Sequence, residues 1–180
     1  MTLTRTDQIL QVLFPEKGQS THSIWMILDG ARDDRIYNFL RTCNLDYACL
    51  YSGNLPIELR YVAPYLLELP YNSKTARELI DLAWGNSWGV FLSIEDMSKL
   101  RPHLRKFLKV KDESGNKLIF RYYDPRVLRV FLPICTNEQL KEIFGPIESY
   151  WTEGENEEGM LEYRLDGISL AHSFIMLNGK

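Results

Sequence analysis

The chain has 180 residues, of which 45% are hydrophobic and 25% are charged, and its formal net charge is −3. This length and composition suit one domain with a well-filled hydrophobic core. A membrane helix needs about 18 consecutive apolar residues and a secretory signal needs a continuous apolar segment, and the sequence offers neither. We therefore expect a single domain over residues 1–180 in a cytoplasmic protein without a membrane partner.

Apolar periodicity and turn residues divide the first half of the chain into short elements. The predicted elements are a helix over Thr4–Phe14, a strand over Ser23–Leu28, a helix from about Asp33, a strand over Tyr47–Tyr51 and a helical turn opened by Pro56. Residues 55–69 are rich in Leu, Tyr and Pro, and a groove-forming surface is one interpretation of them.

Helices and strands are also predicted to alternate in the middle of the chain, where residues that end helices are easier to identify. Ser73 predicts an N-cap, and Gly85 predicts the stop of the same helix just after Trp84. The elements expected after it are a strand over Trp88–Leu92, a helix from the capping pair Ser93 and Asp96 to Phe107, and a hairpin of Phe107–Lys111 with Lys117–Tyr122.

The segment FRYYDPRVLRVFLP, residues 120–133, carries an unusual placement of charge. Asp124 predicts an N-cap and Pro125 the first residue of a largely buried helix. Arg126 and Arg129 then form a cationic stripe, and Arg126 lies at the positive end of the helix dipole. Either acidic groups of this chain compensate the two arginines or a partner protein does. We expect Arg126 to be the more structural and Arg129 the more exposed.

The C-terminal part is predicted as a helix followed by strands. Thr136 and Gln139 form a capping box, Gly145 ends the helix, and strands from Ile147 onward are interrupted by the acidic residues 153–158. The whole pattern predicts a mixed α+β (α/β) fold, in which helices flank a mixed sheet and the C-terminal part is more antiparallel and acidic.

The charge is distributed unevenly along the chain. Residues 99–129 carry ten Lys or Arg against three acidic residues, whereas residues 137–166 carry nine acidic residues against two basic ones. The two segments have opposite signs and are expected to attract each other. An overall pI near 5.7, without an RNA-binding signature, argues against a nucleic-acid partner.

The loop after the first strand holds Asp29, Asp33 and Asp34, the best candidates for an active site. Two close carboxylates suit Mg²⁺ binding or acid and base catalysis. The same residues also suit turn formation and helix capping. A small metal-dependent hydrolase built on Asp29 and Asp33 is therefore the alternative function. No nucleotide or cofactor motif occurs, and the isolated histidines suggest no metal site.

Trp84 and Trp88 flank the turn at Gly85 and have two interpretations. Tryptophan often anchors protein interfaces, but Trp84 also continues an apolar helix stripe that belongs in a core. The three cysteines have no metal or redox spacing, and we interpret them as buried thiols; they are Cys43, Cys49 and Cys135.

Several motifs in fixed order resemble those of a domain family of bacterial type VI secretion effector chaperones or adaptors. The matching segments are ILDGARDDRIY (27–37), CLYSG (49–53), VAPYLLEL (62–69), WGNSWGVFL (84–92), residues 104–133 and FGPI (144–147). The resemblance spans residues 24–150 and leaves residues 151–180 unassigned. It implies a noncatalytic protein that binds a cognate toxic effector and promotes its loading onto the VgrG spike, with no catalytic, cofactor or metal residues. Arg126, Arg129, Trp84 and Trp88 are our candidate partner-binding residues.

Overall fold

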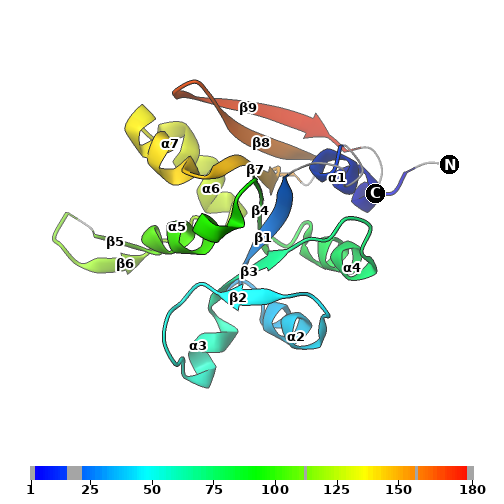
Figure 1. The fold of residues 1–180 in the computed structure, drawn as a ribbon, viewed down its shortest axis with the longest axis horizontal. Helices are drawn as coiled ribbons and strands as arrows, with labels where there is room; N and C mark the ends of the chain where they lie inside the picture. Colours follow the sequence, from blue (N-terminus) through cyan, green and yellow to red (C-terminus); the bar gives the residue numbers. More distant parts are fainter. Residues whose placement is uncertain (1–2, 16–21, 112, 157, 178–180) are drawn as a thin grey trace.

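The structure is a computed structural model that describes residues 3–15, 22–111, 113–156 and 158–177. Its helices and strands alternate along most of the chain (Figure 1). The helices are α1 (Arg5–Leu13), α2 (Asp34–Thr42), α3 (Ile57–Tyr61), α4 (Lys74–Ala83), α5 (Leu100–Lys106), α6 (Pro125–Phe131) and α7 (Asn137–Phe144), with short 3₁₀ turns η1 (Met97–Lys99) and η2 (Leu132–Ile134). The strands are β1 (Ser23–Asp29), β2 (Tyr47–Cys49), β3 (Pro64–Glu68), β4 (Gly89–Ile94), β5 (Lys109–Lys111), β6 (Lys117–Ile119), β7 (Ile147–Glu153), β8 (Gly159–Asp166) and β9 (Ser169–Met176).

One seven-stranded sheet organises the molecule, in the order β2-β3-β1-β4-β7-β8-β9. Each pair of neighbouring strands in it is antiparallel. The predicted α+β class is confirmed, while the antiparallel arrangement expected of the C-terminal part extends across the whole sheet. Strands β5 and β6 form a separate antiparallel hairpin that projects from the body (Figure 1).

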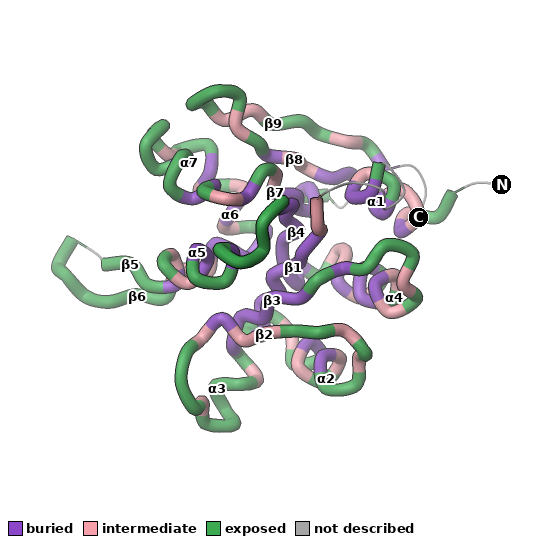
Figure 2. Tube along the Cα trace, viewed as in Figure 1, coloured by how far each residue is buried: buried purple, intermediate pink, exposed green. Residues whose placement is uncertain are grey.

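Helices cover both faces of the sheet, with α1, α2 and α4 on one side and α5, α6 and α7 on the other (Figure 1). Along β1, Met26 and Leu28 pack against the first helical layer, and Trp25 and Ile27 pack against the second. A strand buried on both faces is apolar at consecutive positions rather than at alternate ones. Burial on both faces explains the unbroken apolar run of β1. Figure 2 shows the same burial at the centre of the sheet.

Most predicted helix ends are confirmed by side-chain caps. Ser73 accepts from the backbone of Ala76, and Thr136 with Gln139 forms a capping box. Helix α4 ends at Ala83, one residue before the predicted end at Trp84, and Gly85 follows in the turn. None of the helices in the described part of the chain is long and apolar enough to span a membrane.

Three expectations about the core elements need correction. Within residues 55–69, residues 64–68 form β3, a strand inside the sheet beside β1, whereas Leu55 and Leu59 do line a groove. The capping pair Ser93 and Asp96 is wrong, because Ser93 lies within β4 and Asp96 alone caps the turn η1. The cysteines are free thiols as predicted, but each is only partly buried.

Candidate functional site

Polar residues gather at the end of the sheet where β1 stops. The backbone N–H of Asp29 donates to the carbonyl of Trp88 at 2.7 Å, and that of Gly30 donates to Ala63 at 3.1 Å. These bonds bring the loop after β1 against the starts of β3 and β4. Most sequence-predicted site residues lie around this junction, which we call the sheet-end network.

Asp29 is the buried centre of the sheet-end network. It is fully buried, and its carboxylate accepts from the guanidinium of Arg121, with Nε at 2.9 Å, and from the backbone of Ala31 at 3.2 Å. Burial raises the pKa of Asp29, and the bonds from Arg121 oppose that rise. Arg121 comes from the segment before α6, so this pair fastens the second helical layer to the central strand.

Asp124 extends the network toward the surface. Its carboxylate caps α6 through the backbone of Arg126 at 3.0 Å and also pairs with that residue's guanidinium at 2.6 Å. The side chain of Arg121 lies 3.9 Å from the same carboxylate. Although burial acts to raise it, the bonds from Arg126 hold the pKa of Asp124 below its usual range. Acidic and basic groups thus alternate from the buried Asp29 to the exposed Arg126.

Asp33 plays a similar part at the start of α2. Its carboxylate caps that helix through the backbone of Arg35, pairs with the Arg35 guanidinium at 2.5 Å, and accepts from the indole N–H of Trp88 at 3.0 Å. The Arg35 guanidinium also lies over the Trp88 ring, 5.3 Å from its centre. The bonds from Arg35 lower the pKa of Asp33 far below its usual range.

Glu153, at the end of β7, anchors the turn between α4 and β4. Its two carboxylate oxygens accept from the backbone of Gly85 and the hydroxyl of Ser87, both at 2.7 Å. Its backbone carbonyl accepts from the guanidinium of Arg129 at 2.8 Å. Arg129 therefore binds the acidic C-terminal segment as the sequence suggested, but through a backbone oxygen. No ion pair between residues 99–129 and 137–166 occurs within the described parts of these segments.

The structure revises what the sequence predicts for the four candidate partner-binding residues. Arg126 is paired internally as expected, yet its side chain is 48% exposed. Arg129 is less exposed than Arg126, which reverses our expectation, and α6 is only partly buried because Val130 is exposed. Trp88 is buried within the network, and Trp84 is partly buried against the first helical layer. The partner-binding role of all four stays a prediction.

The two aspartates of the alternative hydrolase are engaged with different arginines. Asp29 binds Arg121 and Asp33 binds Arg35, so neither carboxylate is left open in this conformation. Within the described ranges, no three His, Cys, Asp or Glu side chains are grouped to hold a metal ion. His103 is buried, with its Nε2 atom 2.9 Å from the carbonyl of Ile143, which fits a satisfied histidine. The contacts observed in this network join β1, α2, α6 and β7 to one another and to the loops between them.

Sequence reasoning missed two residues that complete the network. Arg121 lies 92 positions from Asp29, and Glu153 lies 68 positions from Gly85, so no local spacing links either pair. A sequence signal for Arg121 existed, because a basic residue three positions before the cap at Asp124 is placed to reach it. Glu153 was interpreted only as part of an acidic stretch that interrupts strands, and it is buried instead.

A second feature is a set of exposed apolar side chains around the β5–β6 hairpin, whose two strands are exposed in Figure 2. Ile119 of the hairpin is 60% exposed and Ile134, in the nearby turn η2, is 75% exposed. Val110 and Leu118 are opposite each other across the hairpin and are exposed on the other face of it from Ile119, and Val130 of α6 is also exposed. The exposed apolar side chains thus lie on both faces of the hairpin and on the neighbouring elements α6 and η2.

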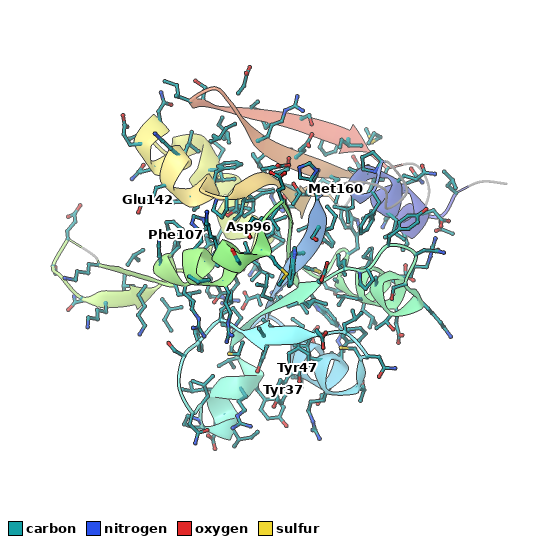
Figure 3. All side chains as sticks on the ribbon, in the orientation of Figure 1. Tyr37, Tyr47, Asp96, Phe107, Glu142 and Met160 are labelled. Carbon is teal, nitrogen blue, oxygen red and sulfur yellow. The ribbon has the colours of Figure 1, made fainter. Side chains whose placement is uncertain are left out.

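A hollow of about 350 Å³ lies beneath one side of the hairpin. Its lining residues are Phe107, Val110, Phe120, Phe131, Gln139, Glu142 and Ile143. Figure 3 labels Phe107 at the end of α5 and Glu142 on α7, which mark the two walls. The hollow therefore adds concave apolar area to the exposed surface.

Comparison with known protein families matches residues 24–142 to the family described as Domain of unknown function (DUF4123). The matched range covers well over half of the 180 residues and runs from β1 into α7. It contains the Asp29–Arg121 pair and the whole β5–β6 hairpin, and it ends before Glu153. Comparisons with curated proteins and with solved structures found no match.

Proposed function

Because the chain belongs to the DUF4123 family, we propose that it is a noncatalytic effector chaperone or adaptor of bacterial type VI secretion. In this role it binds a cognate toxic effector and promotes its loading onto the VgrG spike. The mechanism is reversible protein association in the cytoplasm, without nucleic acid, membrane or cofactor. The proposal rests on family membership together with the ordered motifs quoted from the sequence.

The observation that carries the proposal is the apolar surface around the β5–β6 hairpin. The six residues of β5 and β6 are three apolar residues and three lysines, and all six are exposed. Their side chains therefore contribute little burial to the stability of the isolated fold. Burial of apolar area contributes about 25 cal/mol per Å², so the same side chains can stabilise a complex. A protein partner that covers this surface accounts for the exposure.

The sheet-end network supports the proposal from another direction. Its carboxylates are all engaged with guanidinium, amide, hydroxyl or indole donors, an arrangement that positions elements rather than reacts with a substrate. A rigid sheet with both helical layers fastened to it is a suitable support for a projecting binding surface. The metal-dependent hydrolase remains the alternative function. An activity assay of the purified protein with Mg²⁺ or Mn²⁺ tests it.

Co-expression with the cognate effector tests the proposal. We expect a higher soluble yield of the effector and a complex that survives size exclusion, because a chaperone covers surface that otherwise aggregates. An effector that is equally soluble alone and elutes separately contradicts the proposal.

Alanine variants of the α6 arginines test the predicted partner contacts within that complex. Arg126 is exposed but pairs with the buried carboxylate of Asp124, which keeps its helix-cap bond and lies 3.9 Å from Arg121, so Arg126→Ala should lower the stability of the free protein by about 1 to 3 kcal/mol. If it faces a partner, the same variant weakens the complex and reduces the salt dependence of binding. Arg129→Ala is the second test, and because it also removes the bond to the carbonyl of Glu153, its effect on the complex is compared with its effect on the stability of the free protein.

A further inference from the structure

A second groove, with a volume of about 340 Å³, lies between α3 and the β5–β6 hairpin. Its apolar lining consists of Leu50, Leu55, Leu59, Leu108 and Ile119. Leu59 is 44% exposed, and none of the five residues of α3 is buried. One wall of the groove is therefore a helix whose apolar residues have little contact with the rest of the molecule.

Arginines shape the other walls by binding backbone carbonyls. Arg105 donates to the carbonyls of Leu50 at 2.8 Å and Tyr51 at 3.0 Å, and Arg60 donates to that of Leu55 at 3.1 Å. Arg101 donates to the carbonyl of Cys49 at 2.9 Å. These bonds hold the segment from β2 to α3 in place, so the groove is preformed.

Arg105 lines the groove, and Arg60 and Arg101 bind carbonyls of the segment that forms it, so these arginines give the groove a positive charge. Over the described residues, no carboxylate oxygen lies within 4.0 Å of Arg60, Arg101 or Arg105. Each guanidinium has five N–H donors, so donors remain after the carbonyl bonds. The guanidinium groups of Arg101 and Arg105 both lie against the carbonyl oxygen of Cys49, at 2.9 and 3.5 Å, so they converge beside the groove. Lys109 on the groove wall adds a further cation.

We infer that this groove binds an acidic amphipathic segment of the cargo effector, an inference that rests on the proposed function. Apolar side chains of that segment enter the groove, and its carboxylates pair with the surrounding arginines and Lys109. Helix-in-groove recognition of this kind combines apolar anchors at helical spacing with charge complementarity. A second copy of this chain fits less well, because its acidic helix α7 has its apolar residues Leu140, Ile143 and Phe144 already buried.

A synthetic peptide tests the chemistry of the groove without the effector. The probe is a fluorescent amphipathic peptide with leucine at helical spacing and glutamate elsewhere, compared with a peptide that has lysine in place of glutamate. We expect the glutamate peptide to bind about tenfold more tightly, and increasingly weakly as salt is added, because the cations are exposed. Equal binding of the two peptides, or no saturable binding of the glutamate peptide, overturns the inference.

Groove variants locate the binding. Ile119→Ser and Lys109→Glu should each weaken the glutamate peptide by about threefold to tenfold, since one removes an apolar contact and the other reverses a charge. Ile168→Ser and Lys74→Glu are the matched controls, because both residues are exposed on other elements, and they should leave affinity unchanged. Equal loss in groove variants and controls contradicts the assignment.

The same variants in the effector complex separate this inference from the proposed function. If the groove variants bind the effector as well as the wild type does, the groove is not the binding site. That result overturns the inference and leaves the proposed function intact. A wild-type chain that fails to bind the effector overturns the proposed function, and the cargo assignment of the groove with it. Concentration-dependent dimerisation that is lost in Ile119→Ser assigns the groove to a second copy and also overturns the inference.

Discussion

Replacing Arg121 with methionine removes the counter-charge of a carboxylate that solvent does not reach, because Asp29 is fully buried. Removing one partner of a buried ion pair costs about 3 to 5 kcal/mol. The reciprocal variant Asp29→Asn leaves the arginine, whose side chain is 36% exposed and can be hydrated. We therefore expect Asp29→Asn to cost only about 1 to 2 kcal/mol. The two losses of stability differ because Asp29 is buried, whereas the side chain of Arg121 reaches solvent.

Urea unfolding followed by tryptophan fluorescence measures both losses. Because burial raises the pKa of Asp29, removal of Arg121 lets the native state take up a proton there more readily than the unfolded chain does. The deficit of Arg121→Met should therefore shrink as the pH falls from about 7 toward 5. Arg35→Met is the matched control: Asp33 is 17% exposed and keeps its bond from Trp88, so about 1 kcal/mol or less is expected at either pH. Equal losses in Arg121→Met and Asp29→Asn, or a deficit that does not change with pH, refute the reasoning.

The remaining predictions concern the first helix and the centre of the sheet. Hydrogen bonds from Thr4 and Arg77 lower the pKa of Asp7 to about 2 from 3.8, so the stability that Asp7 contributes above pH 3.8 should be lost as the pH falls toward 2. A thermal unfolding series should show a smaller acid-dependent loss in Asp7→Asn than in the wild type, because Asp33 and Asp124 keep their lowered pKa in both. A Cβ at Gly89 would overlap the carbonyl oxygen of Ile27 in the adjacent strand, so Gly89→Ala should lose cooperative unfolding by circular dichroism; a variant that melts like the wild type contradicts the close strand approach.

Helix ends were the part of the fold most accessible from sequence. The caps at Asp33, Ser73, Asp124 and Thr136 are confirmed, because capping depends on residues two or three positions apart. Strand β3 was missed, because a short apolar run beginning at a proline has no periodicity that separates a strand from a buried turn. Proline fits there because it is the first residue of the strand.

The candidate site was only partly accessible from sequence. Asp29, Asp33 and Trp88 were singled out, and they do meet at one end of the sheet. Their partner Arg121 was not identified, since strand order and helix placement bring it there across 92 positions. The exposed apolar hairpin was predicted as a hairpin but not as a surface, because sequence patterns do not show which side of a short strand remains uncovered.

Reconstitution from purified components tests the central claim most directly. Immobilised VgrG is mixed with the cognate effector, with and without this chain, and the retained effector is quantified. The account predicts that the effector is retained efficiently only when the chain is present, and that retention falls for variants that cannot bind the effector. Equal retention of the effector in the absence of the chain would contradict an adaptor role.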